Sequence, residues 1–134
     1  MKRWELLLAH NHWITIGYRG KDLKLCARCT GVVLGFTSLL ILSMSFDLGP
    51  FLSLPLIYQI ILCILLALPA ILDWITQSWQ IRESNNPLRL VTGFFKGLGI
   101  SLLSMISIPL SYKILLIISI AGLTVNLGLK QNRL

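Results

Sequence analysis

Four apolar stretches, each close to 20 residues long, constrain the fold of this chain more than any other feature. They cover residues 29–46, 55–74, 87–108 and 110–129. A helix needs about 20 apolar residues to cross the hydrocarbon core of a bilayer, and it satisfies its own backbone hydrogen bonds there. We therefore predict an all-α integral membrane protein with four transmembrane helices arranged as two helical hairpins.

The composition agrees with a single membrane domain. The 134 residues are 55% hydrophobic and 13% charged, with a mean hydropathy of +0.79. A soluble domain has about 45–50% apolar and about 25% charged residues. The net charge of +7 is also typical of nucleic-acid-binding proteins. However, the basic residues stand between the apolar stretches and form no basic face interleaved with aromatic residues, so we expect no nucleic-acid partner.

Lysine and arginine gather on one side of the predicted membrane helices. Ten of them fall on that side: Lys2, Arg3, Arg19, Lys21, Lys24, Arg28, Arg82, Arg89, Lys130 and Arg133. Lys113 lies near the other side, and Lys96 falls inside the third stretch. Because cytoplasmic connections carry an excess of basic residues, we expect a multi-pass inner-membrane protein with both termini in the cytoplasm.

The first and third stretches begin with related sequences, TGVVLGF and TGFFKGLG. Each carries two glycines four residues apart, Gly31 and Gly35 in the first and Gly93 and Gly97 in the third. Small residues at this spacing allow two membrane helices to approach closely. We predict that the helical hairpins pack through these two helices. Four short spans bury little surface, which favours a homo-oligomer or another membrane protein as partner.

Residues 1–28 are too polar in their middle to span the membrane, so we expect a cytoplasmic, interfacial helix or hairpin there, preceding a transmembrane domain over residues 29–134. This segment carries the candidate metal ligands: His10, His12, Cys26 and Cys29. Zinc accepts such a set, and a cytosolic Cys-x-x-Cys pair is more often metal-binding or redox-active than a structural disulfide. The alternatives are a thiol redox pair and free thiols that only pack at the interface.

A second polar cluster surrounds the start of the third stretch. Its candidate phosphate-binding residues are Arg28, Arg82, Asn85, Asn86 and Arg89. A helix N-terminus attracts anions through its free N–H groups and its dipole. Arginine matches phosphate geometry because it donates two parallel hydrogen bonds. Since these residues fall at the predicted cytoplasmic face, the pattern indicates a site for a phosphorylated lipid headgroup.

Asp73 and Gln77 end the second stretch, four residues apart and therefore on one helical face. They are the candidate catalytic residues, with Asp73 acting as a base or as a ligand of a cation. The alternative is that Asp73 only forms an ion pair with Arg82, Arg89 or Lys96, because a carboxylate near lipid needs a partner.

Three motifs, LCARCTGVVLGF, DWITQ and RESNNPLRLVTG, together resemble a family of small bacterial and archaeal membrane proteins, the domain of unknown function 2085. The resemblance covers roughly residues 9 to 99 and implies a shared fold and a shared site. The family usually has a Cys-His pair where this chain has Ala9 and His10, and a glycine where it has Trp74. More distantly, the second half is similar to VanZ-like membrane proteins, which are linked to resistance against antibiotics directed at envelope glycolipids.

These observations lead to three hypotheses for function. The first is a lipid-handling enzyme or carrier that binds a phosphorylated lipid headgroup at the cytoplasmic face. The second is a metal- or thiol-dependent sensor or accessory subunit with a zinc site. The third is a structural component of a membrane complex, in which the polar cluster only joins the helical hairpins.

Overall fold

Four long helices, one short helix and a β-hairpin are the elements of a computed structural model, which describes residues 13–18, 20–79, 81 and 85–130. The order is β1 (Trp13–Tyr18), β2 (Lys21–Cys26), α2 (Ala27–Ser45), the short α3 (Gly49–Leu52), α4 (Leu56–Ser78), α5 (Asn86–Met105) and α6 (Leu110–Lys130). The four longer helices are each long and apolar enough to cross a membrane. The predicted all-α membrane fold is therefore confirmed, and the protein is a multi-pass membrane protein.

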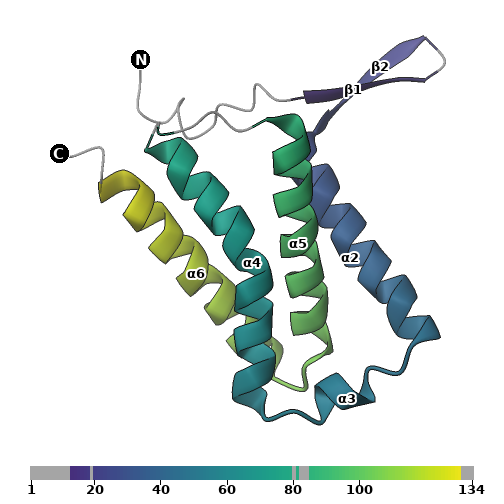
Figure 1. Cartoon of the computed structure of the whole chain (residues 1–134), viewed down its shortest axis with the longest axis vertical. Coiled ribbons are helices and arrows are strands. Elements are labelled where there is room, and N and C mark those ends of the chain that lie inside the picture. Colours follow the sequence, from purple (N-terminus) through teal and green to yellow (C-terminus); the bar gives the residue numbers. More distant parts are fainter. Residues whose placement is uncertain (1–12, 19, 80, 82–84, 131–134) are drawn as a thin grey trace.

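The four long helices alternate in direction (Figure 1). The start of α2, the end of α4, the start of α5 and the end of α6 consequently lie at the same end of the molecule, beside the β-hairpin (Figure 1). We call this the polar end. The short helix α3 and the connection between α5 and α6 lie at the opposite end (Figure 1). The arrangement is two helical hairpins of like orientation, as predicted.

The segment before the first membrane helix is a β-hairpin in its described part. β1 and β2 pair antiparallel from Trp13 opposite Cys26 to Tyr18 opposite Lys21. Gly20 in the turn has a φ of 76°, which glycine adopts without strain. Between the helix and hairpin alternatives, the hairpin is the one observed for these residues.

Helix boundaries differ from the prediction by a few residues. α2 begins at Ala27 instead of Cys29, and α4 continues to Ser78 instead of ending at Trp74. α5 ends at Met105, three residues before the predicted Ile108. The reason is Pro109, because the residue before a proline is sterically disfavoured in a helix. The extension of α4 matters most, since it places Gln77, as well as Asp73, inside the helix.

α2 and α5 pack with their backbones in close contact through the four predicted glycines. A Cβ atom on Gly31 would lie 2.2 Å from the carbonyl oxygen of Leu90, and one on Gly35 would lie 2.0 Å from that of Phe94. Gly93 faces α2 in the same way, 2.4 Å from the carbonyl oxygen of Arg28. No side chain larger than hydrogen fits at such distances, so the predicted packing of the first and third helices is confirmed.

α6 is the most loosely packed of the four helices. Gly128 is its one buried residue among those described, and it lies against the ring of Trp74 on α4. Nearby, the indole N–H of Trp79 donates to the carbonyl oxygen of Leu127 at 3.2 Å. These contacts hold α6 to α4 near the polar end, and farther along the bundle its Leu116 packs against the apolar core around Cys63, Leu102 and Leu103.

Candidate functional site

An ion pair between α2 and α4 forms the centre of the polar end. Arg28 Nη2 donates to Asp73 Oδ2 at 2.5 Å. The close approach of Gly93 to the backbone of Arg28 brings the first turn of α2 against α5, within reach of α4. The Asp73 side chain is 2% exposed and that of Arg28 is 22% exposed. The pair is therefore largely removed from solvent on the carboxylate side.

Gln77 and Arg89 extend this ion pair into a four-residue network. The Gln77 amide donates from Nε2 to the Asp73 carboxylate at 3.4 and 3.5 Å, which are long hydrogen bonds. Its Oε1 accepts a hydrogen bond of 3.0 Å from Arg89 Nη2 on α5. Gln77 thus connects Arg89 to the ion pair between Asp73 and Arg28. We call Arg28, Asp73, Gln77 and Arg89 the arginine network.

The arginine network carries more positive than negative charge. It contains two guanidinium groups and one carboxylate, and it joins three different helices. Arg28 Nε and Arg89 Nε are both buried, and neither has a hydrogen-bond partner among the described residues. Because a buried donor without an acceptor is costly, the geometry favours an additional acceptor with negative charge at this position.

The ion pair differs from the one expected. We expected Asp73 to pair with Arg82, Arg89 or Lys96, whereas the structure pairs it with Arg28 from the first helix. Arg89 reaches Gln77 instead. The sequence spacing could not show this, because the pairing depends on how each helix is rotated about its axis.

The two asparagines lie at the start of α5. Asn85 is the N-cap residue, with Asn86 the first helical residue and Pro87 following it. Asn85 is exposed, and its carbonyl oxygen accepts a hydrogen bond of 3.0 Å from the backbone N–H of Arg89. The Asn86 side-chain oxygen is buried and finds no donor in the described part of the chain. Both asparagines are therefore one helical turn from Arg89, while Arg82 lies outside the described residues.

The candidate metal ligands divide between described and undescribed residues. Cys26 and Cys29 sit at the junction of β2 and α2, and His10 and His12 lie outside the described residues. Within residues 13–18, 20–79, 81 and 85–130, no group of three His, Cys, Asp or Glu side chains is placed to hold a metal ion. The proposed zinc site therefore stays a prediction.

Cys26 has a perturbed thiol. Burial raises the pKa of Cys26, but the backbone and thiol of Cys29, together with the backbone and charge of Arg28, outweigh this effect, so that the pKa of Cys26 is lowered. A lower pKa means a larger thiolate fraction, which makes Cys26 a better nucleophile and metal ligand at neutral pH.

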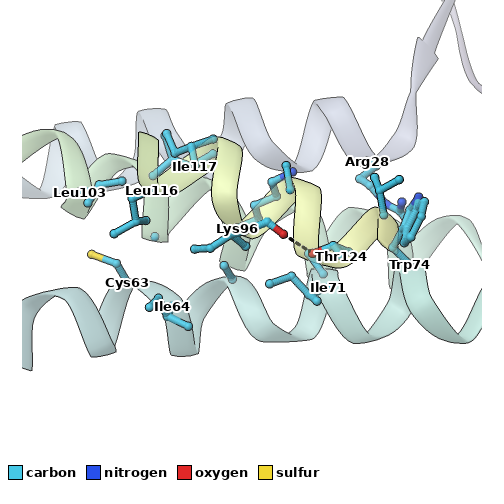
Figure 2. Close-up of a pocket in the computed structure, with 17 residues that line it drawn as sticks. Arg28, Cys63, Ile64, Ile71, Trp74, Lys96, Leu103, Leu116, Ile117 and Thr124 are labelled. Atoms are coloured by element: carbon cyan, nitrogen blue, oxygen red, sulfur yellow. Dashed lines mark hydrogen bonds between the residues drawn. The ribbon is translucent and has the colours of Figure 1, made fainter. Parts of the chain in front are cut away.

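A groove that the sequence analysis missed lies between α4, α5 and α6. It has a volume of about 260 Å³ and an almost entirely apolar lining. Arg28 and Trp74 lie at one end, Leu103 and Leu116 lie toward the other, and Lys96 lies between them (Figure 2). No sequence pattern indicates this groove, because it exists only where loosely packed α6 stands away from α5.

Four membrane-length helices with a cationic network at one end define a small polytopic membrane protein. Comparison with known proteins shows the family to which it belongs. The chain belongs to the family described as predicted membrane protein (DUF2085), whose profile matches residues 10–103. It is 36% identical over 95 residues to an uncharacterized protein of Methanothermobacter thermautotrophicus, which covers 69% of this chain and 78% of that protein. No solved structure matches the chain.

The matched region bears on the candidate site. Residues 10–103 include all four members of the arginine network, and they end before α6. The family assignment confirms the resemblance noted in the sequence, from which we expected a shared fold. The more distant VanZ-like resemblance stays a prediction.

Proposed function

We propose that the protein binds the phosphorylated headgroup of a membrane lipid at its polar end, as a lipid-handling enzyme or carrier. The observation that carries this proposal is the excess positive charge of the arginine network. The network holds two guanidinium groups and one carboxylate, with Arg28 paired to Asp73 and Arg89 bonded to Gln77, and each arginine keeps a buried Nε–H without an acceptor among the described residues.

A phosphate group suits this network for geometric and electrostatic reasons. Its oxygens accept parallel hydrogen bonds from a guanidinium group, and its charge balances the second arginine. The N-terminus of α5, at Asn85 and Asn86, adds the positive end of a helix dipole one turn from Arg89. A lipid reaches this position from within the bilayer, because the network lies at the ends of membrane-length helices.

In this proposal Asp73 and Gln77 position the two arginines. Asp73 holds Arg28, and Gln77 holds Arg89 while contacting Asp73. The catalytic alternative, in which Asp73 acts as a base or as a cation ligand with Gln77 beside it, stays a prediction. Gln77→Leu removes the hydrogen bond between Gln77 and Arg89 but keeps both guanidinium groups. It therefore tests the role of Gln77 separately from headgroup binding by the arginines.

Native mass spectrometry of the purified protein tests headgroup binding. The probes are dihexanoyl phosphatidic acid and dihexanoylglycerol, which differ only in the phosphate. We expect the phosphatidic acid to bind more tightly, and Arg89→Ala to weaken its binding about 10- to 100-fold through loss of a charge-assisted contact. Arg89→Lys should restore only part of that loss, because lysine cannot form the bidentate contact.

Lys21→Ala is the matched control, because Lys21 is an exposed cation of the β-hairpin. It should bind both probes as the wild type does. Equal binding of the phosphatidic acid by wild type and Arg89→Ala would contradict the proposal and would favour the structural role of the network.

We further propose that the polar end faces the cytoplasm. The distribution of basic residues supports this orientation. A membrane-impermeant maleimide added to intact cells should leave Cys26 and Cys29 unlabelled. It should label a cysteine introduced at the exposed Ser107, in the connection at the opposite end. Labelling of Cys26 or Cys29 from outside would reverse the assignment.

The second candidate function is a zinc-dependent or thiol-dependent sensor or accessory subunit. The observation in its favour is the interaction between the thiols of Cys26 and Cys29, which places two potential ligands together. Protein purified without added metal should then contain zinc in a stoichiometric amount, lost in Cys26→Ser and kept in Cys63→Ser. Absence of zinc from the wild type would contradict this candidate.

A further inference from the structure

The groove between α4, α5 and α6 has the dimensions of a site for one hydrocarbon chain. Its volume of about 260 Å³ lies just below the range of roughly 300–1,000 Å³ found for small-ligand pockets. Along α4 it extends from Cys63 to Trp74. At about 1.5 Å of rise per residue this is roughly 16 Å, close to half of the hydrocarbon thickness of about 30 Å. The groove therefore covers about the depth of one leaflet, beginning at the polar end.

Among the described residues, the two charged ones that line the groove are both cations. Arg28 lines one end, where it also belongs to the arginine network, and Lys96 lines the middle. Lys96 lies seven residues after Arg89 on α5, about 10 Å deeper along the helix. No described residue accepts a hydrogen bond from Lys96. A cation at that depth in the bilayer pairs with an anion or extends toward the headgroup level, and the phosphate of an anionic lipid would supply the anion.

The apolar walls exclude a free phosphate ion as the ligand of the groove. The lining is contributed by residues such as Ile64, Ala67, Ile71, Ile100 and Leu103, and it offers almost no polar surface. A second copy of this chain also fits poorly. Among the acidic residues that the structure describes, Asp73 is the one inside a membrane-length helix, and it is already paired with Arg28.

We propose that this groove holds one alkyl chain of the lipid whose phosphate the arginine network binds. The chain extends from Arg28 and Trp74 toward Leu103 and Leu116, with α6 as the outer wall (Figure 2). This inference rests on the proposed function, and it adds that the ligand is a long-chain anionic lipid whose chain contributes to selection. Because lipid tails are as apolar as the groove, the selectivity comes from close packing of the chain.

Two adjacent isoleucines of α6 provide a matched pair for testing the groove. Ile117 lines the groove, whereas Ile118 is 65% exposed and does not line it. Ile117→Trp fills the groove, and Ile118→Trp adds the same bulk outside it. Ala121→Phe, which also fills the groove, keeps the test valid if Ile117→Trp displaces α6. Neither Ile117 nor Ala121 belongs to the arginine network.

The experiment compares dihexadecanoyl with dihexanoyl phosphatidic acid by native mass spectrometry in one detergent. We expect Ile117→Trp and Ala121→Phe to raise the Kd of the long-chain lipid about three- to tenfold and to leave the short-chain Kd unchanged. Ile118→Trp should change neither Kd. Arg89→Ala should raise both, because the two lipids share the phosphate.

The outcomes separate the groove from the headgroup site. Unchanged long-chain binding in both groove variants, with both lipids weakened by Arg89→Ala, would overturn the groove assignment and leave the proposed function standing. Weaker long-chain binding in the groove variants, with Arg89→Ala equal to wild type, would overturn the headgroup assignment. It would also overturn the proposal that chain and phosphate belong to one ligand.

Discussion

Replacing Gly31 or Gly35 by alanine tests the close packing of α2 against α5, which brings Arg28 to Asp73. A Cβ on Gly31 would lie 2.2 Å from the carbonyl oxygen of Leu90, about 1.2 Å short of the 3.4 Å at which ordinary contact begins. A Cβ on Gly35 would lie 2.0 Å from the carbonyl oxygen of Phe94, so the steric overlap there is larger. The opposing atoms belong to backbone, so they cannot rotate away, and the helices must separate.

The expected cost follows from overpacking and helix propensity. Forcing an extra methyl group into a packed interface costs about 1–3 kcal/mol, and a clash with backbone falls in the upper part of that range. Alanine is up to about 1 kcal/mol more favourable than glycine inside a helix, which offsets part of this cost. We expect a net loss of about 1–2 kcal/mol in the free energy of unfolding, or roughly 3–10 °C in Tm.

Gly122 on α6 is the matched control, because a Cβ there would meet nothing within 4 Å. Gly122→Ala should leave the Tm unchanged or raise it slightly. The assay follows thermal exposure of Cys63, 5% exposed, with a thiol-reactive fluorogenic maleimide in a Cys26→Ser, Cys29→Ser background. Tm values of Gly31→Ala and Gly35→Ala equal to or above that of Gly122→Ala would refute the inferred approach of the helices.

Three further predictions concern single polar groups. Asp73→Asn should lower the free energy of unfolding by about 2–4 kcal/mol, because it leaves Arg28 partly buried without its carboxylate. The same change in an Arg28→Gln background should cost much less in the maleimide assay, and equal costs in the two backgrounds would contradict the ion pair. Cys26 should react with iodoacetamide at a lower pH than free cysteine does, because its lowered pKa gives more thiolate at each pH below the ordinary value. Trypsin releases this residue in the peptide Leu25–Arg28, so mass spectrometry can follow it separately from Cys29, and a profile at or above that of free cysteine would oppose the prediction. Gln59→Ala should cost about 1–3 kcal/mol, because the buried amide of Gln59 donates to the carbonyl oxygens of Leu52 and Leu54 at 3.1 and 2.7 Å. Asn126→Ala, whose side chain is exposed on α6, is the comparison expected to cost little.

The membrane helices could be predicted from the sequence because span formation depends on local hydrophobicity. A run of about 20 apolar residues forms a helix in lipid whatever it packs against. The packing of α2 on α5 was also predictable, since Gly31 and Gly93 leave no side chain to prevent close approach. The segment ending at Cys26 left a helix and a hairpin equally open, and its described part is a hairpin.

The partners of the polar residues were decided by the tertiary structure. Asp73 pairs with Arg28, 45 residues away, because the contact of Gly93 with the backbone of α2 sets how the helices face each other. The apolar groove arises because α6 is held to α4 near Trp74 and stands away from α5. Hydropathy is additive along a chain and fixes which segments enter the membrane. Helix rotation and spacing depend on all four helices together, so they determine which charges meet and where a lipid chain fits.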